Sequence, residues 1–443
     1  MSTMFASLRQ FNYRLWFAGA LVANIGTWMQ RVGQDWLVLA YLSGESGTAV
    51  GIVTALQFIP SLFLSPLAGV LADRVDQRKL LMVTQGLMGL LAAGLGLLVL
   101  GGHAELWQVY IFAFLLGIAS AFDAPARQTF VAELVPADGL ANAVALNSAS
   151  FNAARLIGPG LAGLLIAAVG PGWVFIINAV SFAATIGAMM AMRTGELRHA
   201  PRMKKAKGQL REGLAYVRHR SDIVMIMAVV FLVGGIGLKF QLTSAVMARV
   251  EFGMDAGEYG VLGSVLAIGS LGGALMAARR KQPRVRTVII AAAGFAVAST
   301  LLALAPTYEL FALACIPVGF TSLTMLTSAN AAIQISTDPA IRGRVMALYM
   351  MVLFAGNPLG APLVGWVADA WGPRWSIGIG AIVAGLVVIV ASIWARKHWH
   401  VQVRYSLRQR PHMTFTNAEE RAARRAAQVE EAVRESSDAT TAA

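Results

Sequence analysis

Four polar or aromatic residues spaced for one helical face interrupt the first apolar run: Asn24, Trp28, Arg31 and Asp35. Steps of four, three and four residues place them on one side of a helix, where we expect them to line a cavity. Arg31 and Asp35 are four residues apart, so they can form an ion pair that offsets the burial of either charge. Asp35 could take up a proton or bind a cationic group of a substrate. The alternative hypothesis is a structural pair that fixes helix packing while Asp35 stays ionised.

Two more cations stand in apolar surroundings, Arg155 and Lys239. Arg155 shares a helical face with Asn152, and we expect both to belong to the same cavity. Lys239 could titrate, attract an anionic substrate or extend to the outer membrane surface, and its sequence surroundings favour none of the three. The run that follows Arg155 contains four bending or small residues: Gly158, Pro159, Gly160 and Gly163. Such residues bend a helix and let a neighbouring helix approach closely.

A dense group of charges occupies Gly69-Val-Leu-Ala-Asp-Arg-Val-Asp-Gln-Arg-Lys79, between the second and third apolar runs. Its charged residues are Asp73, Arg74, Asp76, Arg78 and Lys79. So many charges are costly in an apolar layer, which predicts a loop just outside the bilayer. There Gly69 permits close helix contact, and we expect Asp73 to accept hydrogen bonds from the N-terminal end of a helix in the second half. This loop would be a conformational latch and not the substrate site.

The composition is that of a membrane protein. Of 443 residues, 57% are hydrophobic and 13% charged, whereas soluble proteins have about 25% charged residues. Apolar runs close to the ~20 residues of one bilayer crossing recur along the chain. We predict an all-α polytopic membrane protein with twelve transmembrane helices, at 15–42, 49–72, 80–101, 107–123, 141–169, 173–192, 222–248, 258–278, 287–305, 309–335, 345–369 and 375–395.

The placement of Lys and Arg predicts the orientation. If the N-terminus lies inside, 31 of the 36 fall in inside segments, two outside and three within spans. Cytoplasmic loops carry an excess of these residues, so we expect both termini in the cytoplasm and the chain in the cell membrane. The net charge of +13 reflects this asymmetry and does not indicate nucleic-acid binding.

Two six-helix pseudo-repeats match at an offset of 202 residues. The clearest matches are Gly170, Pro171 and Trp173 with Gly372, Pro373 and Trp375. Parallel repeats of this kind are typical of secondary transporters. We divide the chain into an N-terminal bundle (1–193), a basic cytoplasmic linker (194–221), a C-terminal bundle (222–396) and a loosely ordered cytoplasmic tail (397–443). A run similar to the charged loop, from Gly365 to Arg374, corresponds in the repeat to Gly163–Gly172, so we expect it to face outside.

The pattern Gly-x-x-x-Asp-Arg-x-x-x-Arg-Lys at Gly69–Lys79 resembles the signature between the second and third helices of the major facilitator superfamily. Gly158–Gly163 resembles the fifth-helix motif of the superfamily's exporters, with Ala162 where a glycine is usual. Gly26–Trp36 and Ala121–Gln128, which we interpret as a loop after the fourth span, are similar to the transmembrane secretion effector branch. That branch includes enterobactin-exporter-like drug:proton antiporters. Many proton-driven exporters carry an arginine in the fourth span, whereas residues 110–122 contain no charge.

The resemblance implies a secondary transporter, with proton-coupled efflux of small amphipathic drugs or secondary metabolites, siderophores included, by alternating access. An importer or uniporter of a small solute is one alternative, and a transport-dead membrane sensor or scaffold is another. We expect no enzyme activity, no nucleotide-driven transport and no cofactor beyond the proton gradient, since no catalytic set or phosphate-binding motif is found. No metal site is expected at His398 and His400, which lack a nearby carboxylate or cysteine. The expected partners are the lipid bilayer, a small-molecule substrate and protons, and we expect a monomer.

Overall fold

The computed structural model of the chain describes residues 3–198, 209–278, 285–338, 341–399, 402–406 and 412–416. Its contacts divide the chain into two units, Met1–Gly385 and Leu386–Ala443. The described residues of the first unit are helical almost throughout, which is how a backbone satisfies its hydrogen bonds inside a lipid layer. The predicted all-α membrane protein is confirmed.

Six long helices make up the first half of the chain: α1 (Phe11–Trp36), α2 (Gly47–Arg74), α3 (Gln77–Leu100), α4 (Leu106–Leu134), α5 (Leu140–Val169) and α6 (Pro171–Met190). Short helical turns accompany them: η1 (Thr3–Arg9), η2 (Leu37–Leu42), η3 (Ala137–Gly139) and η4 (Thr194–Glu196). Polar side chains at N-caps explain where α2 and α3 begin. Ser46 accepts a hydrogen bond from the Ala49 N–H, and Asp76 accepts one from the Lys79 N–H.

The second half begins with α7 (Gln209–His219), which lies within the predicted linker. It continues as α8 (Ser221–Leu232), η5 (Val233–Gly237), α9 (Phe240–Val246), η6 (Met247–Glu251), α10 (Ala256–Ala278), α11 (Val285–Leu304), α12 (Tyr308–Ser336), α13 (Arg342–Trp371) and α14 (Pro373–Trp399). The predicted span 222–248 is therefore not one regular helix. Leu238 and Lys239 interrupt it with non-helical ψ angles of 41° and 35°.

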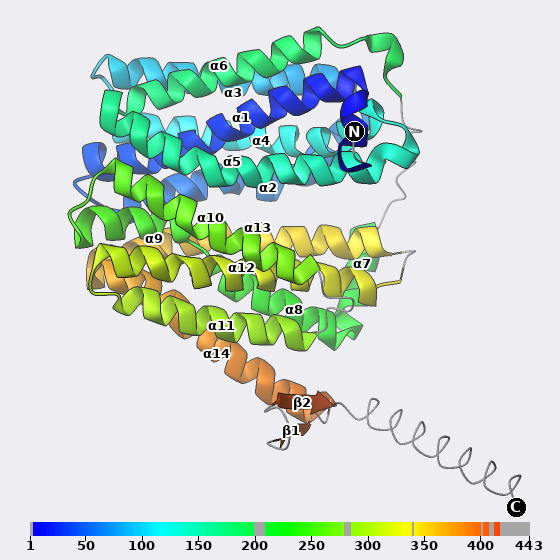
Figure 1. Cartoon of the computed structure of the whole chain (residues 1–443), viewed down its shortest axis with the longest axis vertical. Coiled ribbons are helices and arrows are strands. Elements are labelled where there is room, and N and C mark those ends of the chain that lie inside the picture. Colours follow the sequence, from blue (N-terminus) through cyan, green and yellow to red (C-terminus); the bar gives the residue numbers. More distant parts are fainter. Residues whose placement is uncertain are drawn as a thin grey trace, which may run out of the picture. The chain divides into compact units, whose positions relative to one another are not determined.

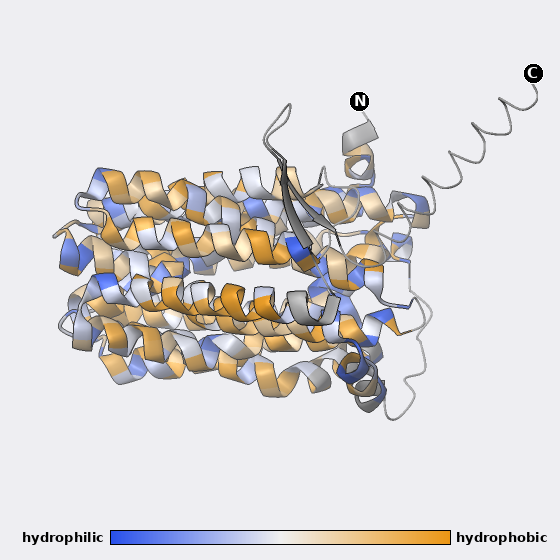
Figure 2. Ribbon diagram, turned by 90° about the horizontal axis from the view of Figure 1, so that it is seen from below, coloured by the Kyte–Doolittle hydropathy of each residue, from blue (hydrophilic) through white to orange (hydrophobic). Residues whose placement is uncertain are grey.

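Eleven helical segments of the described residues are long and apolar enough to cross a membrane. The helix that falls short is α1, which has 26 residues but carries the polar face that includes Arg31 and Asp35. Large apolar side chains such as Phe63, Leu90 and Leu359 are at least 70% exposed, as suits a lipid-facing surface. Figure 2 shows apolar residues along the helices and hydrophilic ones gathered towards the helix ends.

The repeat is visible in the turns that leave α5 and α13. Gly170 has φ 85° and Gly372 has φ 99°, a left-handed conformation that favours glycine. In each turn a proline follows and starts the next helix, α6 or α14. The sequence repeat thus reflects two equivalent tight turns.

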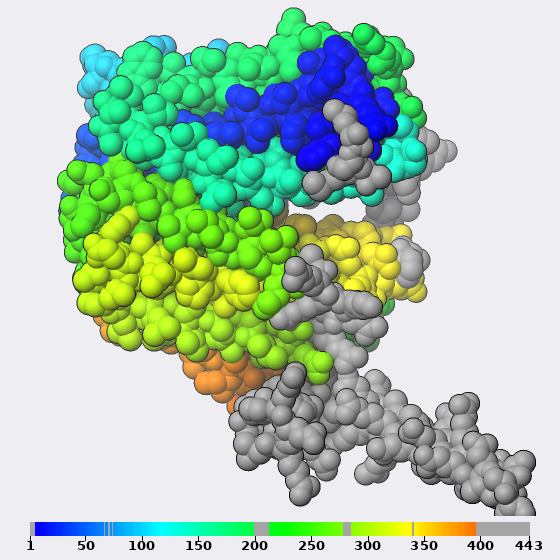
Figure 3. All heavy atoms as spheres, viewed as in Figure 1, coloured from blue at the N-terminus to red at the C-terminus, as the bar shows by residue number. Residues whose placement is uncertain are grey.

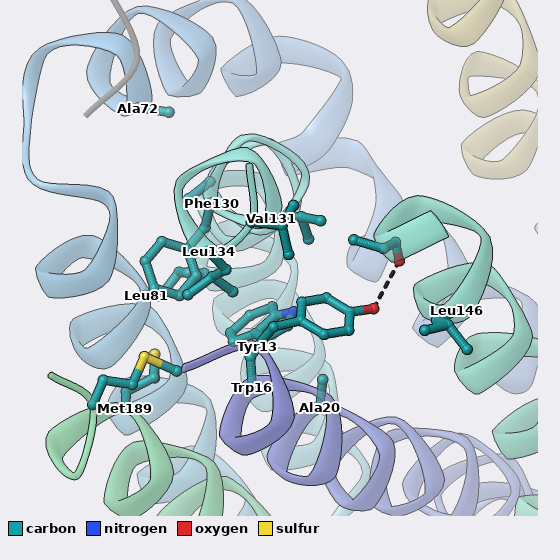
Figure 4. Close-up of a cluster of buried hydrophobic side chains, with 14 residues drawn as sticks. Tyr13, Trp16, Ala20, Ala72, Leu81, Phe130, Val131, Leu134, Leu146 and Met189 are labelled. Atoms are coloured by element: carbon teal, nitrogen blue, oxygen red, sulfur yellow. Dashed lines mark hydrogen bonds between the residues drawn. The ribbon is translucent and has the colours of Figure 1, made fainter. Parts of the chain in front are cut away.

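Two helix pairs join the halves, α2 with α13 and α5 with α10 (Figure 1). Within the first half, α1 packs against α5 and α6. A buried cluster at the start of α1 contains Tyr13, Trp16, Leu81 and Phe130 (Figure 4). The Tyr13 hydroxyl donates to the Ala143 carbonyl of α5 at 2.8 Å, so this aromatic anchor satisfies its polar atom inside the cluster.

The second unit holds the last part of α14 and an antiparallel pair of strands, β1 (Gln402–Ser406) and β2 (His412–Thr416). Their register pairs Arg404 with Thr414 at its centre. This hairpin lies in the predicted tail, where the sequence indicated no strand. The rest of the tail, from residue 417 on, lies outside the described residues.

Candidate functional site

The helices have two ends, and the candidate residues divide between them. We call the end at which α1 begins and α2 finishes the first end. The end at which α1 finishes and α2 begins is the second end. The charged loop Gly69–Lys79 lies at the first end and the run Gly365–Arg374 at the second.

The polar face of α1 is organised around Trp28 and not around an ion pair. The guanidinium carbon of Arg31 lies 4.9 Å from the Trp28 ring centroid, and that of Arg155 lies 5.7 Å from the same ring. Such cation–π contacts offset part of the cost of burying a cation. Among the described side chains no ion pair joins Arg31 to Asp35. The two charges of the predicted pair attract each other but are not in direct contact, because the indole ring holds Arg31 and Tyr259 of the other half binds Asp35.

Asp35 is buried in the contact between the two halves. It is 7% exposed, and the Tyr259 hydroxyl of α10 lies 3.4 Å from its Oδ2 atom. The same hydroxyl lies 3.3 Å from the Gln241 carbonyl, and the Tyr259 ring stacks on Trp36 at 5.8 Å. Asp35 therefore belongs to a seam near the second end. Sequence reasoning missed Tyr259, since nothing local to α10 reveals a partner 224 residues away.

The proline-glycine run of α5 packs against helices of both halves. Gly158 faces α1, where an added Cβ would lie 2.6 Å from the Trp28 Cβ atom. Three residues of the run lie against α10: Pro159, Gly160 and Gly163. A Cβ on Gly163 would lie 3.1 Å from the Cα atom of Gly260. Larger side chains here would move α5 away from its neighbours.

Lys239 lies at the interruption of the seventh span. Its ammonium donates to the Gly234 carbonyl at 3.1 Å and to the side-chain oxygen of Asn357 on α13. Lys239 is 5% exposed, and no described Asp or Glu side chain pairs with it. Gly360 makes room for its stem, since a Cβ there would lie 3.2 Å from the Lys239 Cε atom.

The repeat relates Lys239's partner to Arg155. The offset of 202 that aligns Gly158 with Gly360 also aligns Arg155 with Asn357. In the first half this position carries a cation over Trp28, and in the second half it carries an amide bound to Lys239. In each half a positive charge therefore lies at or beside the same repeat position, on α5 in the first half and on α13 in the second.

The two predicted asparagines are less engaged. Asn152 is exposed, and its amide nitrogen donates to the Ser148 carbonyl of its own helix at 2.8 Å. Asn24 is half-buried, and within the described part of the chain its side chain makes no hydrogen bond. Neither is bonded to the charged residues.

A cavity of about 260 Å³ lies among the second-half helices, with Arg155 of α5 in its wall. Its aromatic and apolar lining includes Phe240, Phe295 and Phe354, and its polar lining includes Asn357. Separately, Figure 3 shows a hollow between the halves at the first end. An apolar wall with a few polar groups is the usual character of a small-molecule site.

At the first end the described side chains of the charged loop bond within the first half. Arg78 donates from Nε to the Met189 carbonyl of α6 at 2.8 Å, and Asp76 caps α3. Arg74 and Lys79 are exposed. The side chain of Asp73 lies outside the described residues. So do residues 279–284 between α10 and α11, which the repeat offset of 202 relates to this loop.

The second half is likewise tied to itself at this end. Arg344 at the start of α13 pairs with Glu212 of α7 at 2.5 Å. Arg220 donates to the Ser336 carbonyl at the end of α12 at 3.0 Å and forms an ion pair with Asp222 at 2.7 Å. The hydrogen bond to Asp222 raises the pKa of Arg220 above its ordinary value, so the guanidinium stays charged.

At the second end the halves are clasped together. Asp369, near the end of α13, accepts hydrogen bonds from the Ser46 hydroxyl at 2.8 Å, the Gly47 N–H at 2.6 Å and the Thr48 N–H at 2.9 Å. A carboxylate at this position neutralises the partial positive charge of the α2 N-terminus. Across the same seam Arg249 pairs with Glu45 at 2.9 Å. We call the Asp369 contacts the clasp.

A buried ion pair in α4 was missed from the sequence. Asp123 is 5% exposed and pairs with Arg127 at 2.9 Å, while the Thr84 hydroxyl donates to it at 3.0 Å. The predicted end of this span at 123 and the loop at Ala121–Gln128 are wrong, because these bonds let α4 continue to Leu134. An arginine therefore does lie in the fourth helix, and its i,i+4 spacing from Asp123 was the available signal.

No three described His, Cys, Asp or Glu side chains are grouped so that they could hold a metal ion. The side chains of His398 and His400 lie outside the described residues.

A family model described as transmembrane secretion effector matches residues 2–426. The chain is 29% identical over 366 residues to the multidrug efflux pump Tap of Mycolicibacterium fortuitum, which covers 80% of this chain and 88% of that protein. It is 24% identical to the staphyloferrin A transporter of Staphylococcus aureus over 81% of this chain and 90% of that protein. Its fold matches a bacterial homologue of the human lysosomal transporter Spinster, crystallised in an inward-facing, unoccupied conformation. The TM-score is 0.67 at 15% identity, over 87% of this chain and 97% of that one.

Proposed function

The chain belongs to the transmembrane secretion effector family of major facilitator transporters, and we propose that it exports small amphipathic compounds by alternating access. The observation that carries this proposal is the contrast between the helix ends. The halves are clasped at the second end by Asp369, while a hollow separates them at the first end. Rocking of two bundles that alternately closes one end and opens the other is how such transporters move a substrate.

The orientation we propose places the first end and both termini in the cytoplasm, with the chain in the cell membrane. The support is the excess of Lys and Arg in the segments at that end. In this orientation the hollow collects substrate from the cytoplasm and the clasp seals the outer side. That is the loading state of an exporter. The similarity to the multidrug efflux pump Tap supports the same direction.

We further propose that proton inflow drives export, with the chain acting as a monomer that needs the proton gradient and no other cofactor. Asp35 is the residue to which we assign the proton, because this acid is buried in the seam and faces Tyr259 of the other half. Proton uptake there would change a contact that spans the two halves. The mechanism makes and breaks no covalent bond in the substrate.

The test is uptake into inverted membrane vesicles that contain the full chain. When a pH gradient with an acidic lumen is imposed, the vesicles should accumulate at least one compound from a panel of amphipathic drugs and iron chelators. An uncoupler should abolish the accumulation. Asp35→Asn should remove the dependence on the gradient, whereas exchange of the exposed Asp138 for Asn should leave it intact. Vesicles that accumulate none of the compounds, or that accumulate them equally with an uncoupler present, would contradict proton-coupled export.

A further inference from the structure

The cavity among the second-half helices has a wall that carries donors and positive charge. Arg155 lines it directly, and Asn357 lines it with an amide whose oxygen is occupied by Lys239. Because the oxygen faces the ammonium, the amide nitrogen of Asn357 is left with its two N–H donors for another acceptor. Lys239 thus orients a donor in the wall as well as adding charge behind it.

The two cations at this cavity, Arg155 in its wall and Lys239 behind Asn357, lack carboxylate partners among the described residues. Among the described side chains, Arg155 makes a cation–π contact with Trp28 but no ion pair, and Lys239 bonds only to neutral oxygens. The cavity lining contains no Asp or Glu among the described residues. The intramembrane acid Asp35 accepts from Tyr259 and interacts electrostatically with Arg31, and it does not line the cavity. The region therefore has an excess of positive charge in surroundings where charge is poorly screened.

We propose that this cavity binds an acidic group of the exported compound, so that the substrates are anionic amphiphiles with a carboxylate or similar oxyanion. The proposal rests on the exporter function proposed above and names its substrate class. The acidic group is held between Arg155 and the Asn357 amide, with Lys239 as the charge behind the amide. The apolar body of the compound packs on the aromatic side chains Phe240, Phe295 and Phe354. A bound anion supplies the charge that the protein itself does not provide.

The binding experiment uses two compounds of the same shape, 2-naphthoxyacetate and 2-naphthoxyacetamide, which differ in charge. Each is titrated into the purified full chain in detergent at neutral pH, with binding followed by isothermal titration calorimetry. Because a hydrogen bond to a charged group contributes about 1.5–3 kcal/mol, the acid should bind at least about tenfold more tightly than the amide.

Three variants test the assignment of the site. Lys239→Gln and Arg155→Gln should each weaken binding of the acid about tenfold while leaving the amide within about twofold, since each removes one charged contact. Asn357→Asp should have the largest effect, because it pairs with Lys239 and adds a negative charge to the wall. The matched control is Arg14→Gln, because Arg14 is exposed and lies 5.7 Å from the Phe11 ring centroid, outside the cavity. Unchanged amide binding reports that each variant is folded.

Equal binding of acid and amide, no saturable binding of the acid, or variants that leave acid binding unchanged would overturn the proposal. Transport separates this failure from failure of the exporter function. Acid preference without accumulation in inverted vesicles would support the anion site and contradict proton-driven export. Accumulation of neutral or cationic drugs by a protein that does not prefer the acid would support export and contradict the anion site.

Discussion

The two ends of the helix pair α2 and α13 carry similar motifs but are bonded differently. At the second end Asp369 of α13 binds the start of α2, and α2 and α13 touch backbone to backbone at Gly51 and Ala361. At the first end the charged loop after α2 bonds to α6, and the start of α13 bonds to α7. At the second end an aspartate of one helix thus caps the N-terminus of the other and closes the pair. That Asp73 does the same at the first end is our prediction.

Substitutions at the two ends are therefore expected to change the population closed at the second end in opposite directions. Nitroxide labels at positions 103 and 309 can measure that population, because both positions are exposed at the second end, one in each half. The native Cys315 is buried, so the label should react with the introduced cysteines. Distances between the labels, measured by double electron–electron resonance, give the populations closed and open at the second end.

The largest effect is expected from Gly51→Leu. A Cβ at Gly51 would lie 2.8 Å from the Cα atom of Pro362, so the side chain would wedge α2 from α13. Overpacking costs about 1–3 kcal/mol, which shifts the equilibrium between the states closed and open at the second end by about fivefold or more. Gly187→Leu is the control, since an added Cβ there meets no atom within 4 Å. A label distance that does not change in Gly51→Leu would show that this contact does not hold the closure.

The next effect is expected from Asp369→Ala, which removes all three hydrogen bonds of the clasp. Loss of a helix cap costs about 0.5–2 kcal/mol, so the ratio of closed to open molecules at the second end should fall by about twofold to thirtyfold. Asp369→Asn keeps an acceptor and should lose less. If Ala and Asn at this position give the same populations as Asp, the clasp contributes nothing to closure.

Asp73→Asn should act in the opposite direction and by less. At the first end Asp73 is expected to cap the start of a second-half helix when that end closes, so its neutralisation should favour closure at the second end. A charge at a helix end contributes about 0.3–1 kcal/mol, a shift of about twofold to fivefold. Transport should slow while substrate affinity stays nearly constant. A large loss of affinity would contradict the latch function.

The smallest effect is expected from Arg249→Gln. Its partner Glu45 is 43% exposed, and exposed ion pairs contribute about 0–1 kcal/mol. The closed population should change by less than about fivefold and become insensitive to the mutation in high salt, because salt screens surface charges. An effect of Arg249→Gln that persists at 1 M salt would mean that the pair is shielded from solvent, in contrast with its exposure.

The helices could be predicted from sequence because a bilayer demands long apolar segments, and the glycine turns at 170 and 372 show the repeat directly. The end of α4 was missed, because Asp123 and Arg127 look like loop residues. Their i,i+4 spacing was the local signal, and the hydrogen bond from Thr84 of α3 could not be seen in the sequence. The same limit applied to the candidate site. Its charged residues stood out in the sequence, but their partners depend on which helices meet, and this sequence pattern does not specify those contacts.

The limited apolarity of α1 has a consequence for biosynthesis. A charge at the centre of an isolated membrane helix costs about 2.5–3.5 kcal/mol in insertion assays. Arg31 and Asp35 lie in the second half of α1, so each adds part of that cost. One of its packing partners is Thr185, whose hydroxyl binds the Gly19 carbonyl from 166 residues downstream. At about 5–20 residues per second, the ribosome needs roughly ten seconds or more to supply that residue. The first helix to be made thus waits for α5 and α6 before its polar face is covered, so we expect its retention in the membrane during synthesis to depend on the translocation machinery.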